Sequence, residues 1–299
     1  MPSYLSELNK HERDSDISFE EGPHIYTVKR ERGTYTSVTT WVHKHFSKFD
    51  ADAIIDKMMQ SKNWTDPNYK YYGMTKNEIK QMWNTKRDTS AGAGTNMHYD
   101  IECYYNNMEV NNDSIEYRYF LEFVRDFPEL KPYRTEWMVY YEEQKLSGSI
   151  DMIFENPDGT IQIYDWKRCQ EIVQETNFEQ YSITPCISHL PDTNYWHYTL
   201  QLNTYKKILE DKYGKKVSNL FLICLHPDNT NKTYQRIEVP ILETEMNDLF
   251  NYRLEELKKE ELKKKYANNN KTKEQTPINN ETKQTPRKKG NLLIDINSL

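Results

Sequence analysis

Two carboxylates and one ammonium stand on neighbouring predicted strands, where buried apolar side chains would be expected. The segment IDMIFENPDGTIQIYDWKR, residues 150–168, alternates apolar residues on both sides of an Asn-Pro-Asp-Gly turn, which predicts a β-hairpin. Asp151 lies on the first arm, and Asp165 and Lys167 lie on the second. A four-residue turn places Asp151 opposite position 164 or 165, so the two carboxylates are expected to be near neighbours across the ladder.

This arrangement suits divalent-metal chemistry. Adjacent carboxylates repel unless a positive group lies between them, and Mg²⁺ or Mn²⁺ takes carboxylate oxygens together with substrate phosphate. Lys167 would orient or deprotonate a water, or stabilise charge on the phosphate. The alternative is a solvated hairpin face with an ordinary ion pair. The apolar flanks favour a site, because unpaired charge on a buried strand is costly.

A predicted helix upstream supplies an imidazole. The sequence AGAG (91–94) precedes TNMHYDIE, where Thr95 is the expected N-cap and His98 and Glu102 share one helical face. Neutral imidazole suits Mn²⁺, which makes His98 a candidate ligand, against the alternative of a histidine packed in the core. Glu102 is either a partner that orients His98 or a surface ion-pair residue.

Three further polar residues are candidates for supporting roles. Glu136, on the strand before the hairpin, would add another carboxylate or would be only an edge charge. Gln201 and Tyr205 are four residues apart on a predicted helix, so both can face the site. Their alternative is a polar helix face with one packed tyrosine.

In order and spacing, the elements GTNMHYDIE, GSID, YDWK and QLNTY resemble the RecB-type branch of the PD-(D/E)XK nuclease superfamily, which includes the lambda-type exonucleases. The resemblance covers about residues 91–210. It implies an α/β, restriction-endonuclease-like core, with a central mixed β-sheet flanked by helices and a mainly helical N-terminal region before it.

The resemblance also implies residue roles. Asp151 and Asp165 would be the metal-binding acids and Lys167 the signature lysine. His98 and the backbone carbonyl of Trp166 would complete the coordination of Mg²⁺ or Mn²⁺. Gln201 and Tyr205 would contact the nucleic acid or brace the site.

No iron–sulfur cluster is expected. Members of the family with a cluster carry one cysteine before the histidine helix, whereas the first cysteine of this chain is Cys103. The remaining cysteines are also far apart in sequence, so buried free thiols are the default interpretation.

Composition bounds the other function classes. The chain has 299 residues, 36% of them hydrophobic, and a net charge of −6. From Lys258 onward there are 11 basic and 5 acidic residues, which leaves 29 basic and 41 acidic residues before it, a balance of −12. Such an acidic body argues against a general nucleic-acid-coating role. No signal peptide and no apolar run of about 20 residues is seen, so a soluble, intracellular protein without membrane association is expected.

Four segments are expected along the chain. They are a flexible leader (1–22), the mainly helical N-terminal region (23–90), the nuclease core with a C-terminal helix (91–266), and a disordered polar tail (267–299). The tail ends in the apolar NLLIDINSL, which would bind a protein partner or the chain's own body, or be a loose end.

Most elements are predicted from periodicity and turn residues. A hairpin is expected over 24–38 with its turn near Gly33. The helices are expected over 37–46, 51–62, 76–88, 95–106, 113–127, 195–213 and 241–266, and the strands over 133–142, 146–155, 160–166, 218–226 and 233–239.

The function expected from these residues is metal-dependent hydrolysis of DNA phosphodiester bonds, in repair, recombination or replication. An exonuclease is favoured, because a helical N-terminal region can restrict a site to strand ends. The alternatives are a catalytically silent DNA-binding scaffold and a structural subunit whose tail recruits a partner. Tyr104, Tyr105 and Trp196 would stack unpaired bases or belong to the core.

Overall fold

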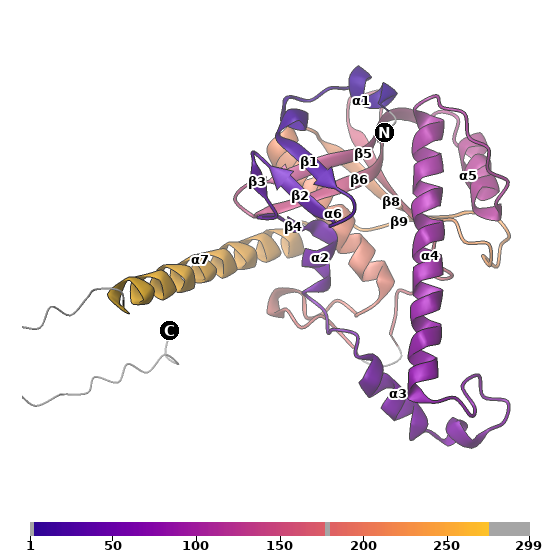
Figure 1. Ribbon diagram of the computed structural model, residues 1–299. Helices are drawn as coiled ribbons and strands as arrows, with labels where there is room; N and C mark the ends of the chain where they lie inside the picture. Colours follow the sequence, from indigo (N-terminus) through magenta and orange to yellow (C-terminus); the bar gives the residue numbers. More distant parts are fainter. Residues whose placement is uncertain (1–2, 177–179, 275–299) are drawn as a thin grey trace, which may run out of the picture. The chain divides into compact units, whose positions relative to one another are not determined.

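The computed structural model describes residues 3–176 and 180–274 (Figure 1). The chain divides into two compact units, residues 1–254 and 255–299. The first unit contains the central sheet and the helices that pack on it. The second begins within the last helix, α7 (Glu243–Glu274).

The central sheet has six strands of mixed direction. Its order is β4-β6-β7-β8-β9, and β5 lies off this path and pairs with β6. The pairs β4–β6 and β7–β8 are parallel, and the others are antiparallel. The strands are β4 (Thr36–Ser37), β5 (Lys131–Tyr141), β6 (Leu146–Glu155), β7 (Ile161–Lys167), β8 (Val217–Cys224) and β9 (Gln235–Glu238). The expected α/β class with a mixed sheet is confirmed.

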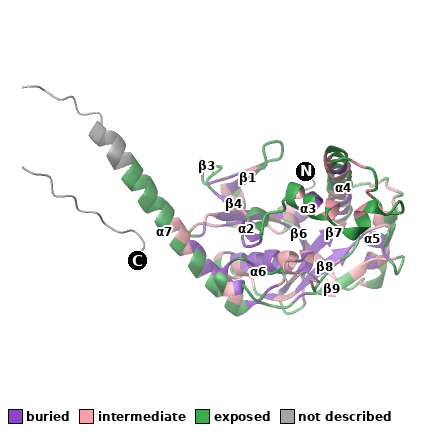
Figure 2. Cartoon of the chain, turned by 90° about the horizontal axis from the view of Figure 1, so that it is seen from below, coloured by how far each residue is buried: buried purple, intermediate pink, exposed green. Residues whose placement is uncertain are grey.

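Helices cover both faces of this sheet. On one face α2 (Val38–His43) and α6 (Asn194–Tyr213) form a core that includes Trp41, Ile153 and Leu200. On the other, α4 (Lys76–Tyr105) and α5 (Ile115–Asp126) pack through Phe120 against Trp166. The strands β6–β8 and helix α6 are largely buried, whereas α3 (Ala51–Met59) buries only Ile55 (Figure 2).

Local sequence explains the elements that carry the site. The β6–β7 turn follows the predicted Asn-Pro-Asp-Gly, with Gly159 at φ +81° and the Asp158 carboxylate accepting the amide hydrogen of Thr160. Helix α6 ends at Gly214, which takes the left-handed conformation expected of a C-cap glycine. Ser114 caps α5 through the amide of Tyr117. The turn and the end of α6 at Gly214 were predicted, and the bounds of α5 were predicted within two residues, but the Ser114 cap was not.

The expectation of a flexible leader over residues 1–22 is wrong for the residues that the structure describes. Residues 3–20 form α1 (Tyr4–Leu8), the 3₁₀ helix η1 (Glu12–Asp16) and β1 (Ile17–Glu20). The carboxylate of Asp14 accepts hydrogen bonds from Arg134 and from the indole of Trp137, both on β5. Long-range contacts of this kind order the segment, and local sequence does not signal them.

The N-terminal region also contains a second, three-stranded sheet. It consists of β1, β2 (Ile25–Val28) and β3 (Glu31–Arg32). The turn between β2 and β3 lies at Lys29 and Arg30, both with positive φ, instead of near Gly33. A type I′-like turn matches the strand twist well enough to outweigh the cost of these residues.

Helix α4 is one continuous element where two helices were expected. It begins at a capping box of Thr75 with Glu78 and runs through AGAG without a break. Thr95 therefore does not cap a helix, and its hydroxyl donates to the Ala91 carbonyl one turn earlier. The alanines and the neighbouring helix formers outweigh the two glycines here.

The start predicted for the disordered tail, residue 267, is too early. Helix α7 continues to Glu274, eight residues past the expected end at 266. The rest of the tail, including NLLIDINSL, lies outside the described residues.

Candidate metal centre

The sheet opens where the two hairpin acids stand. Strands β6 and β7 pair from Glu155 opposite Ile161 to Met152 opposite Tyr164, and the register ends there. Asp151 and Asp165 are the next residue on each strand. β7 continues along β8 beyond this point, so the two strands separate at the carboxylates. The backbone amide of Trp166 donates to Asp151 Oδ2 over 2.9 Å, which fixes the Asp151 side chain at this fork.

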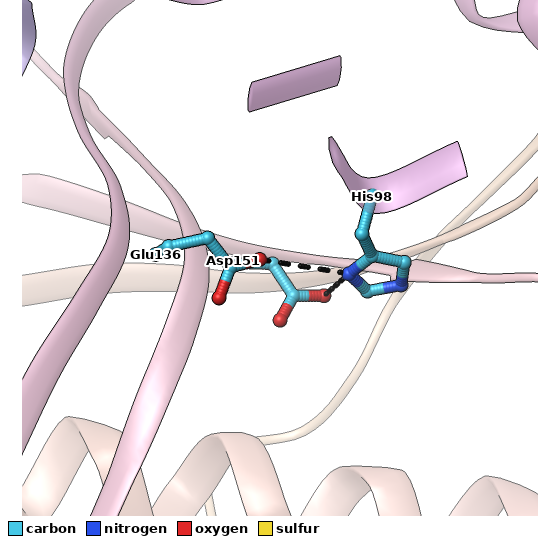
Figure 3. Close-up of side chains that lie close together, drawn as sticks. All are labelled: His98, Glu136 and Asp151. Atoms are coloured by element: carbon cyan, nitrogen blue, oxygen red, sulfur yellow. Dashed lines mark ion pairs between the residues drawn. The ribbon is translucent and has the colours of Figure 1, made fainter. Parts of the chain in front are cut away.

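An imidazole and two carboxylates converge beside the fork (Figure 3). His98 Nδ1, from α4, lies 3.5 Å from Asp151 Oδ2 and 3.7 Å from Glu136 Oε1. Each of the three residues offers one ligand atom, and these atoms lie within 4.8 Å of one another. Three different elements therefore supply a donor set of the kind that holds Mn²⁺ or Mg²⁺.

Glu136 reaches this cluster from an unusual backbone conformation. Its φ is +42°, inside strand β5, a region that costs a non-glycine residue about 1–3 kcal/mol. The Ser149 hydroxyl donates to Glu136 Oε2 over 2.7 Å and holds the carboxylate. Of the two interpretations left open by the sequence, the structure supports the additional carboxylate and not the edge charge.

The orientation of His98 follows from its other nitrogen. Nε2 lies 2.9 Å from the Trp166 carbonyl oxygen. A carbonyl only accepts hydrogen bonds, so Nε2 carries the hydrogen and Nδ1 faces the carboxylates. The Trp166 carbonyl, implied by the resemblance as a metal ligand, here holds the imidazole in place. Such a contact is how proteins usually fix the tautomer of a ligating histidine.

The second hairpin acid has different partners. Asp165 is 2% exposed, and Lys167 Nζ lies 2.6 Å from its Oδ2. Gln201 donates to Asp165 Oδ1 over 3.2 Å, and the Lys167 ammonium lies 4.5 Å from the centre of the Tyr198 ring. Of the expected ligands, His98 and Asp151 lie together and are joined by Glu136, whereas Asp165 pairs with Lys167.

Burial and the charges at the fork shift the pKa values of Asp151, His98 and Lys167. Burial and the Asp165 charge raise the pKa of Asp151 to about 7. Burial lowers the pKa of His98, but Asp151 and Glu136 outweigh it and raise the value to about 9. Burial likewise lowers the pKa of Lys167, and Asp165 and Asp151 raise it above its usual range. The cluster therefore retains protons where a cation would replace them.

Gln201 and Tyr205 both lie on the buried face of α6. Tyr205 is 3% exposed, and a Cβ built on Gly148 would lie 2.7 Å from its ring and from its hydroxyl oxygen. Only glycine at position 148 lets this ring pack so close to β6. The pair therefore braces the fork and presents little surface to a ligand.

The remaining candidates lie outside the cluster. Glu102 is 9% exposed, so it is not a surface ion-pair residue, and burial and Glu136 raise its pKa to about 7. Tyr105 packs against Phe120 and Phe154 in the core, and Trp196 is partly buried against the other core. Tyr104 is 36% exposed.

Three residues at the site were missed by sequence reasoning. Ser149 donates to Glu136, and the Lys167 ammonium lies over the ring of Tyr198. The pKa of Tyr26 is raised by burial and then by the nearby charges of Glu136 and Asp151. The sequence held a signal for the first two, namely their spacing from residues already assigned to the site. Ser149 stands two residues before Asp151 on the same strand, and Tyr198 precedes Gln201 by one helical turn. Tyr26 carried none, because it comes from the N-terminal sheet.

Comparison of the sequence with models of known protein families, and with curated proteins, found no match. Within residues 3–176 and 180–274, no helix combines the length and the apolar character needed to cross a membrane.

Proposed function

We propose that this protein is a metal-dependent DNA nuclease with a restriction-endonuclease-like core of the RecB type. The observation that carries the proposal is the convergence of His98, Glu136 and Asp151 at the point where β6 and β7 separate. The Asp165–Lys167 pair lies on the next positions of the same hairpin. A purely structural hairpin has no need for this concentration of buried charge.

The donor set fits a hard or borderline divalent cation. Two carboxylates and an imidazole would hold Mn²⁺ or Mg²⁺, and burial together with the Asp165 charge raises the pKa of Asp151, a cost that a bound cation would offset. Asp165 is the other acid of the hairpin at the point where β6 and β7 separate. Once bound, the metal would lower the pKa of the attacking water and offset charge on the phosphate.

The chain's own residues would position the reaction. Lys167 is held by Asp165 in the ammonium form, which suits stabilisation of phosphate charge better than removal of a proton from water. The Trp166 amide fixes Asp151, and its carbonyl fixes His98. Gln201 holds Asp165 from α6.

The test is cleavage of end-labelled linear DNA, single- and double-stranded, beside circular DNA, with Mg²⁺, Mn²⁺ or EDTA. We expect hydrolysis with either metal, none in EDTA, and a preference for linear substrates if the enzyme is an exonuclease. Asp151→Asn should abolish it, and Asp211→Asn, away from the fork, should not. Binding of DNA without turnover in any metal would instead identify a silent scaffold, and cleavage that persists in EDTA would exclude the mechanism.

A further inference from the structure

Residues 44–90, here called the aromatic arm, differ in charge from the rest of the first unit. They contain nine basic and six acidic residues, within a body (residues 1–257) that carries a balance of −12. The arm includes α3, the 3₁₀ helix η2 (Lys62–Thr65) and the first half of α4. In Figure 1, α3 lies at the end of α4 remote from the sheet.

The aromatic side chains of the arm include a connected group that is partly open to solvent. Trp83 donates a hydrogen bond to the Tyr71 hydroxyl, and its ring lies 5.9 Å from that of Phe49. Phe49 is 72% exposed and Tyr72 is 51% exposed. Exposed rings beside basic residues are the usual means of binding unpaired bases.

The acidic residues of the arm are already engaged, whereas several of its lysines are not. Asp52 and Asp56 pair with lysines of α4, and the other acids cap helices or turns or pair with Arg87. In the described part of the chain, no ion pair joins Lys57, Lys62 or Lys86 to an acid. The arm therefore presents unpaired positive charge to a polyanion.

Helix α4 connects the arm to the metal centre along one face. Trp83, Arg87, Ala91, Gly94 and His98 follow at spacings of three or four residues, so they share one side of the helix. The Arg87 side chain is 71% exposed, and its neighbour Asp88 holds it only in an exposed pair. A Cβ built on Gly94 would meet no atom within 4 Å, so there is space directly beside the helix at this position, one turn before His98.

We propose that the aromatic arm binds the unpaired strand of a DNA substrate and that this face of α4 leads the strand to His98. The inference rests on the proposed function and adds the substrate class to it. Phe49 and Trp83 would stack bases, Arg87 would contact a phosphate, and the open stretch at Ala91 and Gly94 would allow the strand to lie against the helix.

The helix also sets a length requirement. Trp83 and His98 are 15 residues apart, or about 22 Å at about 1.5 Å per residue. At the spacing of a stacked strand, about 3.4 Å per nucleotide, about 6–7 nucleotides reach from one to the other. A shorter strand contacts the arm and the metal centre together only if it is more extended.

The experiment measures binding of labelled oligothymidylates of 4 to 16 nucleotides to the full chain in EDTA, where no cleavage occurs. A Phe49→Ala, Arg87→Gln protein is compared with wild type and with a control that carries Tyr252→Ala and Lys10→Gln, an exposed aromatic and an exposed cation outside the arm. We expect the arm variant to bind the 12-mer and 16-mer at least about 10-fold more weakly. Its salt dependence should also be shallower, by about 0.7 in the logarithmic slope for each lost phosphate contact.

For strands of up to 5 nucleotides the loss caused by the arm variant should be smaller than for the 12-mer and 16-mer, because a short strand makes fewer contacts with the arm, and a 12-bp duplex should show little effect of the arm variant. Equal affinity of the variant and wild type at every length would overturn the inference and leave the arm to a protein partner. An equal loss for duplex and single strand would also overturn it. Since the assay needs no turnover, an arm effect without cleavage in Mg²⁺ or Mn²⁺ would reject only the proposed function.

Discussion

The two ends of helix α4 belong to regions with opposite characters. At the C-terminal end, Met97 and Ile101 are 3% and 1% exposed, and His98 is held between a backbone carbonyl and two carboxylates. At the N-terminal end, Ile55 and Ile79 are fully buried, but the surrounding rings and lysines of the arm face solvent.

The contrast fits two different tasks, catalysis at the C-terminal end of α4 and binding of the substrate strand at its N-terminal end. Reacting groups must stay within about 0.5 Å of their working positions, which requires rigid supporting elements. A surface that binds a flexible strand needs only charge and exposed rings, and it tolerates variation in the geometry of each contact. Damage at the fork should therefore abolish turnover, and damage in the arm should change affinity and length dependence.

Among variants that leave His98, Glu136 and Asp151 in place, loss of the Lys167 ammonium should give the largest effect. Lys167→Met is expected to slow single-turnover cleavage by about 10²–10⁴-fold while leaving oligothymidylate binding in EDTA within about twofold of wild type. Because this variant leaves Asp165 buried without its cation, it should also be destabilised. The Asp165→Asn, Lys167→Met protein should recover stability without recovering activity, and a recovery of activity would contradict the role of the lysine.

Two isoleucine variants compare the stability of the regions directly. Ile153→Ala, in the central core, is expected to cost about 2–5 kcal/mol of the global unfolding free energy. Ile79→Ala removes an equally buried side chain, but its effect should be confined to faster hydrogen exchange over residues 51–90. If both variants lower the main unfolding transition equally, the arm is not a separate region.

The sequence predicted the fork better than its surroundings. The alternation of apolar residues and the Asn-Pro-Asp-Gly turn predicted the hairpin, and the period of two placed Asp165 and Lys167 on one face. Glu136 could be named only as an open alternative, because its approach depends on a positive φ that no residue type signals. The docking of residues 3–20 depends on contacts such as Asp14 to Arg134, 120 positions apart.

The packing of Tyr205 against β6 gives an intermediate prediction. Gly148→Ala places a methyl group 2.7 Å from the Tyr205 ring, so one of the two must move, at a cost of about 1–3 kcal/mol by chemical denaturation. Turnover should fall as well, because Tyr205 and Gln201 lie on the same buried face of α6. Adding Tyr205→Ala to Gly148→Ala should cost less than the sum of the two single changes, and strict additivity would argue against direct packing.

Proton binding at the fork gives the smallest effect. The folded-state pKa of His98, about 9, is above the ordinary 6.5, so its stabilising contribution is complete below pH 6.5 and is lost as the pH rises through 9. The pKa of Asp151 is raised from 3.8 to about 7, so its stabilising contribution is also lost as the pH rises, but over a lower pH range. In EDTA, the melting temperature should fall between pH 6.5 and 9, and His98→Gln should flatten that fall. A melting temperature that rises over this range in the wild type would contradict the assignment.

The central claim is that His98, Glu136 and Asp151 hold a divalent cation, and Mn²⁺ binding followed by electron paramagnetic resonance at pH 8 tests it most directly. We predict one tightly bound Mn²⁺ whose spin-echo spectrum shows coupling to an imidazole nitrogen. His98→Gln should remove this coupling and weaken Mn²⁺ binding by about 10–100-fold. Mn²⁺ that binds without nitrogen coupling in the wild type, or with unchanged affinity in both His98→Gln and Asp151→Asn, would contradict the account.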